Sequence, residues 1–216
     1  MNDPIYILKR DITSYIYPPH IKRPPGFEGS NFFEKWIPLW TRRLSHLSNQ
    51  PNILGIEIGT NRGDCAVFCA EKIVNGENSV HYTIDIVEQE CVRNNIGPYK
   101  NIKMILGKSS DVLINRNIFK LQCADYIFID GSHTAIGVLV DAVYSWPLLK
   151  KGGILIFDDY GWGIHTTDET MKPKIAIDAF LSIYKGKYEI LEHGWQIFLK
   201  KIDDETSDPE YQYETK

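Results

Sequence analysis

Acidic residues follow several short apolar runs of this sequence, at positions where an α/β sheet contacts its ligands. Asp130 follows the run 126–129, and Asp158 and Asp159 follow the run 154–157. Ligands of open parallel sheets bind at the carboxyl ends of the strands. Three carboxylates pointing together there would repel one another without a cation, and oxygen ligands favour Mg²⁺, with Ca²⁺ or Mn²⁺ as alternatives. In the alternative interpretation, one aspartate of the pair caps a turn and the other faces water.

His133 lies three residues after Asp130 and is a candidate general base. The ordinary pKa of histidine, about 6.5, leaves it mostly neutral at pH 7 and able to take a proton from an attacking hydroxyl. Asp130 would act beside it as a catalytic residue. The alternative is a structural histidine that bonds to the backbone of the next loop. His165 is a second candidate for the base.

A glycine loop of the form E-x-G-x-x-x-G follows the first apolar run. It lacks the G-x-G-x-x-G spacing of a dinucleotide site. An acidic residue at its start is unfavourable beside a pyrophosphate but suits a cation such as the sulfonium and amino groups of S-adenosylmethionine. The alternative is an ordinary strand–turn–helix loop. The candidate cofactor contacts of this loop are Glu57, Gly59, Thr60, Asn61 and Gly63, and Asp130 is a further candidate.

Two later positions extend this candidate cofactor site. Asp85 ends the second apolar run, and a carboxylate there can accept two hydrogen bonds from ribose hydroxyls. Ser109 and Ser110 follow the third run, where an adenine would lie. The alternatives are a surface aspartate and serines that cap a helix.

These candidates need a sheet that brings the ends of its strands together. Short apolar runs alternating with helical patterns predict an α/β, Rossmann-like three-layer sandwich, with a mostly parallel seven-stranded sheet and an antiparallel C-terminal strand. The predicted strands are 52–58, 81–86, 102–106, 126–129, 154–157, 188–191 and 195–199, and the predicted helices are 31–47, 64–74, 135–149 and 173–184. We expect an N-terminal arm and helix at 1–50, where the arm is either loose or a cover of the acceptor site, a cofactor-binding domain at 51–202 and a polar tail at 203–216.

Composition limits the class of function. The chain has 216 residues, of which 43% are hydrophobic, and a net charge of −4, which argues against nucleic acid as a partner. Its four cysteines form no zinc pattern and are expected to be free thiols in a reducing compartment. No apolar run is long enough to span a membrane or to form a signal peptide. We therefore expect a cytoplasmic protein, as a monomer or a homo-oligomer.

Four segments together resemble the class I S-adenosylmethionine-dependent methyltransferases. They are ILGIEIGTNRG, YTIDI, ADYIFIDGSH and LLKKGGILIFDDYGW. The resemblance runs from about Ile53 to Leu199 and is greatest to the macrocin O-methyltransferase and cephalosporin-hydroxylase-like branch, the methyltransferase 24 type. Its more specific part is the pairing of Asp-Gly-x-His with Asp-Asp-Tyr.

The resemblance implies a divalent metal held by Asp130, Asp158 and Asp159. In macrocin-type members, an acidic residue proposed as the base lies two positions after the first aspartate; here Ser132 stands there, with His133 next to it. The expected activity is metal-dependent O-methylation of a small-molecule or glycan acceptor, preferably a sugar hydroxyl. The alternatives are a catechol-like phenol acceptor, a non-catalytic binding module and an NAD-dependent oxidoreductase. The aromatic residues expected to line the acceptor pocket are Tyr160, Trp162, Trp195, Trp36 and Trp40.

Overall fold

A seven-stranded sheet organises the protein, with the strand order β3-β2-β1-β4-β5-β7-β6. The computed structural model describes residues 33–203. The segment 1–32 and the tail from 204 lie outside the described residues, so the arm and most of the predicted tail are not described. The strands are β1 (Leu54–Ile58), β2 (Val80–Asp85), β3 (Ile102–Leu106), β4 (Ala124–Ile129), β5 (Leu149–Phe157), β6 (Tyr188–His193) and β7 (Ile197–Lys201).

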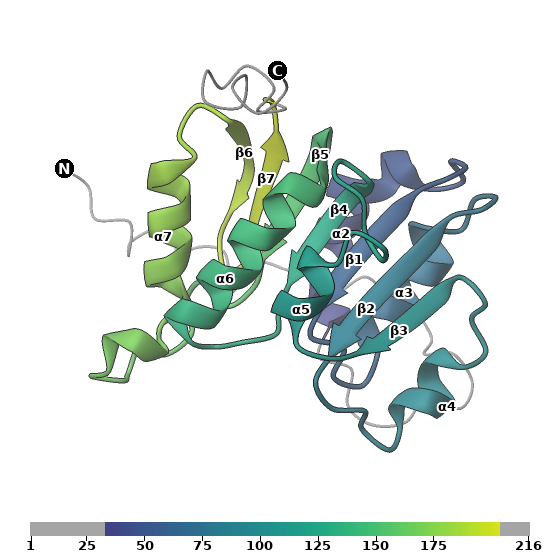
Figure 1. Cartoon of the computed structure of the whole chain (residues 1–216), viewed down its shortest axis with the longest axis horizontal. Coiled ribbons are helices and arrows are strands. Elements are labelled where there is room, and N and C mark those ends of the chain that lie inside the picture. The colour runs from purple at the N-terminus through teal and green to yellow at the C-terminus, as the bar shows by residue number, and fades with distance from the viewer. Residues whose placement is uncertain (1–32, 204–216) are drawn as a thin grey trace.

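Helices cover both faces of this sheet (Figure 1). The α-helices are α2 (Ile37–Leu44), α3 (Asp64–Lys72), α4 (Val92–Ile96), α5 (Ser109–Ile114), α6 (Ala135–Ser145) and α7 (Pro173–Ile183). The 3₁₀ turns are η1 (Glu34–Trp36), η2 (Ser45–Leu47), η3 (Trp146–Leu148) and η4 (Glu169–Met171). Residues of α5, α6 and α7 share one core with the sheet, and residues of α2 and α3 share another. The predicted three-layer sandwich is confirmed.

Alternation along the central strands builds the two cores. In β4, Ile127 and Ile129 pack toward α5 and α6, whereas Tyr126 and Phe128 pack toward α2 and α3. Successive side chains of a strand point to opposite faces, so a strand covered on both faces is apolar at nearly every position. This explains why the central strands appear in the sequence as continuous apolar runs.

The sheet topology creates a site at the end of β1. β1 pairs in parallel with both β2 and β4, so the chain crosses to opposite sides of β1. Open sheets bind ligands at such a reversal point, beyond the carboxyl ends of the strands. β7 runs antiparallel to β5, which confirms the predicted antiparallel C-terminal strand.

Several predicted boundaries were wrong. The helix predicted at 135–149 ends at Ser145, and β5 already begins at Leu149. Pro147 lacks the N–H that a continuing helix needs, so the chain makes a 3₁₀ turn there. The helix predicted at 31–47 has α2 as its central part, with 3₁₀ turns on either side. The short helices α4 and α5 were not among the predicted helices.

Two expectations from composition are tested by the described residues. All four cysteines, which lie at 65, 69, 91 and 123, are free. Within residues 33–203, the helices are too short or too polar to cross a membrane.

Candidate active site

The glycine loop turns sharply between β1 and α3. Gly59 has a φ of 98°, and a Cβ atom there would lie 2.1 Å from the carbonyl oxygen of Asp130. Gly63 has a φ of 86°, and a Cβ atom there would lie 2.5 Å from the Cγ2 atom of Ile96. Only glycine adopts such conformations readily and leaves this room. Gly59 therefore lets the loop pack directly against the end of β4, and Gly63 lets it pack against α4.

Asp85 holds this loop in place from the end of β2. Its Oδ2 accepts hydrogen bonds from the backbone N–H groups of Thr60, at 3.0 Å, and Asn61, at 3.1 Å. Its Oδ1 accepts one from the backbone N–H of Val87 at 3.0 Å. The Thr60 hydroxyl is buried, 2.6 Å from that of Thr83. Thr60 and Asn61 thus position the carboxylate through their backbone amides.

A cavity of about 440 Å³ opens beside Asp85, a size typical of small-molecule sites. Four of the predicted cofactor residues, Gly59, Asp85, Ser109 and Ser110, line it. Its other lining residues are Ile58, Ile84, Ile86, Gly107, Lys108, Gly131, Ser132, Gly137, Val140 and Asp141. It therefore extends across the ends of β1, β2, β3 and β4.

Glu57, Thr60, Asn61, Gly63 and Asp130 are the predicted cofactor residues outside this lining. Glu57 is buried, with 1% of its surface exposed, and its Oε2 lies 2.9 Å from His81 Nε2. The structure therefore places the Glu57 carboxylate in the protein interior, beside the imidazole of His81.

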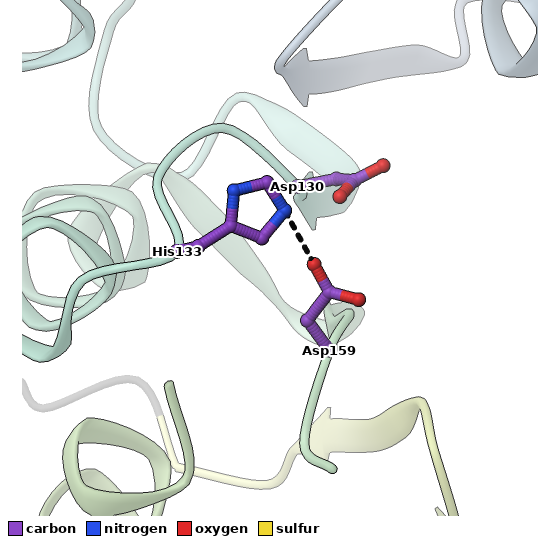
Figure 2. Close-up of side chains that lie close together, drawn as sticks. All are labelled: Asp130, His133 and Asp159. Carbon is purple, nitrogen blue, oxygen red and sulfur yellow. Dashed lines mark ion pairs between the residues drawn. The ribbon is translucent and has the colours of Figure 1, made fainter. Parts of the chain in front are cut away.

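Beside the cavity, three side chains gather at the ends of β4 and β5 (Figure 2). Asp130, His133 and Asp159 each offer a ligand atom, and these atoms lie within 4.8 Å of one another. His133 Nε2 lies 2.8 Å from Asp159 Oδ2. The Asp159 Oδ1 accepts a hydrogen bond of 3.2 Å from the indole N–H of Trp195. We call Asp130, His133 and Asp159 the strand-end cluster.

Asp158 was predicted as a metal ligand but does not join the strand-end cluster. Its Oδ1 accepts a hydrogen bond from the backbone N–H of Asp159 at 2.7 Å, and its Oδ2 accepts one from Gln196 at 3.2 Å. Gln196 is buried and in turn accepts a hydrogen bond from the Trp40 indole at 2.9 Å. Sequence reasoning missed Gln196, whose role depends on the pairing of β7 with β5.

Burial and mutual repulsion disfavour the ionised forms of Asp130 and Asp158. Burial, and then the charges of Asp158 and Asp159, raise the pKa of Asp130 well above its ordinary value. Burial and the charge of Asp159 raise the pKa of Asp158 to about 7. No residue from 33 to 203 donates a hydrogen bond to the Asp130 carboxylate. A divalent cation relieves such repulsion, so the donor set fits a hard metal ion.

The hydrogen bond with Asp159, followed by the charges of Asp159 and Asp158, raises the pKa of His133. Its ring also lies 4.6 Å from the Trp162 ring, between ring centroids. The second candidate base, His165, is exposed and is not a member of the cluster. The structure therefore brings only His133, of these two, to the carboxylates.

Ser132 occupies the position at which macrocin-type members carry an acid. Its Oγ lies 3.0 Å from the Thr134 hydroxyl and accepts a hydrogen bond from the Thr134 backbone N–H at 3.2 Å. Thr134 caps α6 by accepting a hydrogen bond from the Gly137 N–H at 3.1 Å. Ser132 thus helps to shape the loop that carries His133.

The aromatic candidates divide into two groups. Trp162 is 47% exposed beside His133, and Trp195 contacts Asp159, so both lie next to the cluster. Tyr160 is buried, and its hydroxyl donates a hydrogen bond to Asp178. Trp40 is fully buried and packs against Phe128 at 4.9 Å between ring centroids, so it belongs to the core and not to a pocket wall. Trp36 is half-buried at the edge of the same core.

Of the lining residues that sequence reasoning did not propose as cofactor contacts, two are charged. Lys108 precedes the predicted serines, and Asp141 is the one charged residue of α6. Asp141 is 3% exposed and accepts a hydrogen bond of 2.6 Å from the Ser109 hydroxyl. An acid within an otherwise apolar helix was the available signal for it.

Comparisons with known proteins agree with this architecture. Residues 56–160 match a family model described as a methyltransferase domain. TomG, an O-methyltransferase of Streptomyces achromogenes, superposes with a TM-score of 0.63 at 14% identity, over 83% of each chain. An O-methyltransferase of Bacillus cereus gives a TM-score of 0.59 at 17% identity, over 82% of this chain and 84% of that one.

A third similar structure is MycE, a methyltransferase of the mycinamycin pathway. It gives a TM-score of 0.60 at 18% identity, over 82% of this chain and 52% of MycE, so this chain spans about half of MycE. No curated protein sequence matches this chain. At these identities, the structural similarities show the fold.

Proposed function

We propose that this chain, whose residues 56–160 match a family model described as a methyltransferase domain, transfers a methyl group from S-adenosylmethionine to a hydroxyl group of a small acceptor. A sugar hydroxyl, free or within a glycan, is the preferred acceptor, and a catechol-like phenol is the alternative. The observation that carries the proposal is the strand-end cluster, which lies beside the cavity lined by Gly59 and Asp85.

In this proposal, the cavity binds the methyl donor and the strand-end cluster binds the acceptor. Asp85 offers a fixed carboxylate for ribose hydroxyls, while the positive sulfonium of the donor lies near the acidic end of β4. Asp130 immediately precedes Gly131 of the cavity wall, so an acceptor bound at the cluster would lie next to the donor cavity. Such alignment supplies about 7 to 11 kcal/mol of a displacement barrier.

We further propose that Asp130 and Asp159 hold a divalent cation, preferably Mg²⁺. The chemistry that such an ion supplies is a lowered pKa of an acceptor hydroxyl. Asp158, whose Oδ2 accepts a hydrogen bond from Gln196, lies outside this ligand set. The MycE structures hold Mg and S-adenosylhomocysteine, and one also holds mycinamycin VI; these complexes support a metal and a small-molecule acceptor here.

His133 is the proposed base. With Nε2–H donated to Asp159, the neutral ring has Nδ1 free to accept a proton. Asp159 orients the ring and stabilises the imidazolium that forms when His133 takes a proton, as an aspartate does beside the histidine of a catalytic triad. Trp162 packs against the His133 ring.

We propose that the N-terminal region, 1–50, borders the acceptor side of the site, and that residues 51–202 form the catalytic domain. Lys35 in η1 supports this division, because its charge lowers the pKa values of both Asp130 and Asp158. The neighbouring Phe33 is buried against Phe68 and Phe128, which anchors the region beside the site.

Calorimetric titration with S-adenosylmethionine, S-adenosylhomocysteine and NAD tests the donor. The proposal expects binding of the first two, and binding of NAD alone would refute it. Transfer of labelled methyl to sugars, glycosides and catechols, with Mg²⁺ or excess EDTA, then tests the acceptor and the metal. Full turnover in EDTA would exclude the metal role.

A further inference from the structure

Asp141 is a buried acid on the cavity wall that the proposed chemistry does not use. It is the one charged residue of α6, whose other residues are apolar or small. Its side chain is almost fully buried, and it is one of the residues that line the cavity. An ionisable group that stays in so apolar a setting usually has a specific partner.

The order of the strands predicts which part of the donor reaches Asp141. The ends of β1, β2 and β3 are successive along the sheet, and they carry the glycine loop, Asp85 and the segment Gly107–Ser110. With the methionine part of the donor at the end of β1 and the ribose at the end of β2, the base lies at the end of β3. Lys108, Ser109 and Asp141 supply polar groups there, while Ile86 and Val140 provide apolar surface that suits a flat ring.

The hydrogen bonds of Asp141 leave one carboxylate oxygen available. Its Oδ1 accepts the 2.6 Å hydrogen bond from Ser109, and no residue in the described part of the chain donates to Oδ2. Burial raises the pKa of Asp141 to about 6, which leaves the group mainly ionised at pH 7.5. An ionised carboxylate only accepts hydrogen bonds, so its natural partner in a ligand is an N–H group.

We propose that Asp141 selects the base of the methyl donor, by accepting a hydrogen bond from the exocyclic amine of adenine. This inference rests on the proposed function and specifies its donor. A hypoxanthine base presents an oxygen at that position, which would face the carboxylate without a proton between them. A site built to accept from an N–H discriminates strongly against an analogue that lacks it.

Calorimetry with S-adenosylhomocysteine and S-inosylhomocysteine at pH 7.5 tests the proposal. The wild-type protein should bind the adenosyl compound at least about tenfold more tightly. In Asp141→Asn the ratio should fall toward one, because an amide donates as readily as it accepts. The matched control is Asp111→Asn, a neighbouring exposed acid outside the cavity lining, which should keep the wild-type ratio.

Two further variants separate the outcomes. Ser109→Ala keeps the carboxylate and should keep the preference for the adenosyl compound, whereas Asp141→Ala should lose it. Circular dichroism checks that each variant is folded. An unchanged ratio in both Asp141 variants, with S-adenosylhomocysteine still bound, would overturn this inference alone. Failure of the wild-type protein to bind S-adenosylhomocysteine would overturn the proposed function, and this inference with it.

Discussion

Replacing Asp141 by asparagine should stabilise the protein, because the ionised carboxylate is held in a poorly solvated place. Burial raises its pKa from 3.8 to about 6, against a smaller opposing effect of the Ser109 hydrogen bond. That shift corresponds to a cost of about 3 kcal/mol for keeping the ionised form in the folded state. Asparagine has the same shape and keeps an oxygen for Ser109 but carries no charge.

The sign of this effect sets its pH dependence. The folded-state pKa is raised, so the stability associated with the protonated form is complete below pH 3.8 and is lost as pH rises through about 6. The advantage of Asp141→Asn over the wild type should therefore be about 3 kcal/mol at pH 8 and about half of that at pH 5. An imperfectly paired amide reduces both values, but not their difference.

Urea unfolding, followed by circular dichroism at pH 5 and pH 8, measures these free energies. Asp111→Asn is the control: an exposed carboxylate should give little change at either pH. If Asp141→Asn were no more stable than the wild type at pH 8, or if its advantage did not shrink at pH 5, the desolvation argument would be wrong.

Two other substitutions test the donor and the metal separately. Asp85→Ala should weaken binding of S-adenosylhomocysteine by about 10- to 100-fold in calorimetry, because the ribose loses its acceptor and the amides of Thr60 and Asn61 lose theirs; unchanged affinity would place the ribose elsewhere. Asp159→Ala should abolish Mg²⁺-dependent methyl transfer while changing that affinity by less than about threefold, and turnover that survives both this change and EDTA would exclude a metal at the strand-end cluster.

The strand ends were predictable because they depend on local signals. Short apolar runs, each ended by a glycine or an acid, mark the carboxyl edge of a parallel sheet, and strand order then brings those ends together. Gly59, Asp85, Ser109 and Ser110 all line one cavity for this reason. The hydroxyl of Ser109, however, bonds to Asp141, 32 residues away, and no local pattern encodes that distance.

The arrangement of the two neighbouring aspartates was beyond sequence reasoning. Asp159 has a φ of 60°, a left-handed conformation that turns its side chain toward His133. Asp158 instead accepts a hydrogen bond from Gln196 on the loop before β7. Adjacent residues in an extended chain point to opposite sides, and only the local backbone conformation decides which one meets the partner.

The alternation of side chains along β1 decides where Glu57 points, although its place in the E-x-G-x-x-x-G motif suggests a contact with the cofactor. Ile56 and Ile58 belong to the core under α5 and α6, so Glu57 points to the opposite face, under α3. There it meets His81, whose Nδ1 lies 2.8 Å from the hydroxyl of Tyr126. At Gly55, a Cβ atom would lie 2.2 Å from the Tyr126 ring, so its absence leaves room for this chain of polar groups.

Glu57 therefore contributes mainly to stability, in contrast to the direct donor contact that its motif suggests. Glu57→Gln should lower the free energy of unfolding by about 1 to 2 kcal/mol, because the buried hydrogen bond between His81 and a carboxylate is replaced by a weaker one to a neutral amide. The affinity of the folded variant for S-adenosylhomocysteine should change by less than about threefold, which is under 1 kcal/mol. Glu88→Gln, which breaks an exposed pair with Arg93, is the matched control and should change neither quantity appreciably. A Glu57→Gln protein of unchanged stability that had lost its affinity would instead place this carboxylate on the donor.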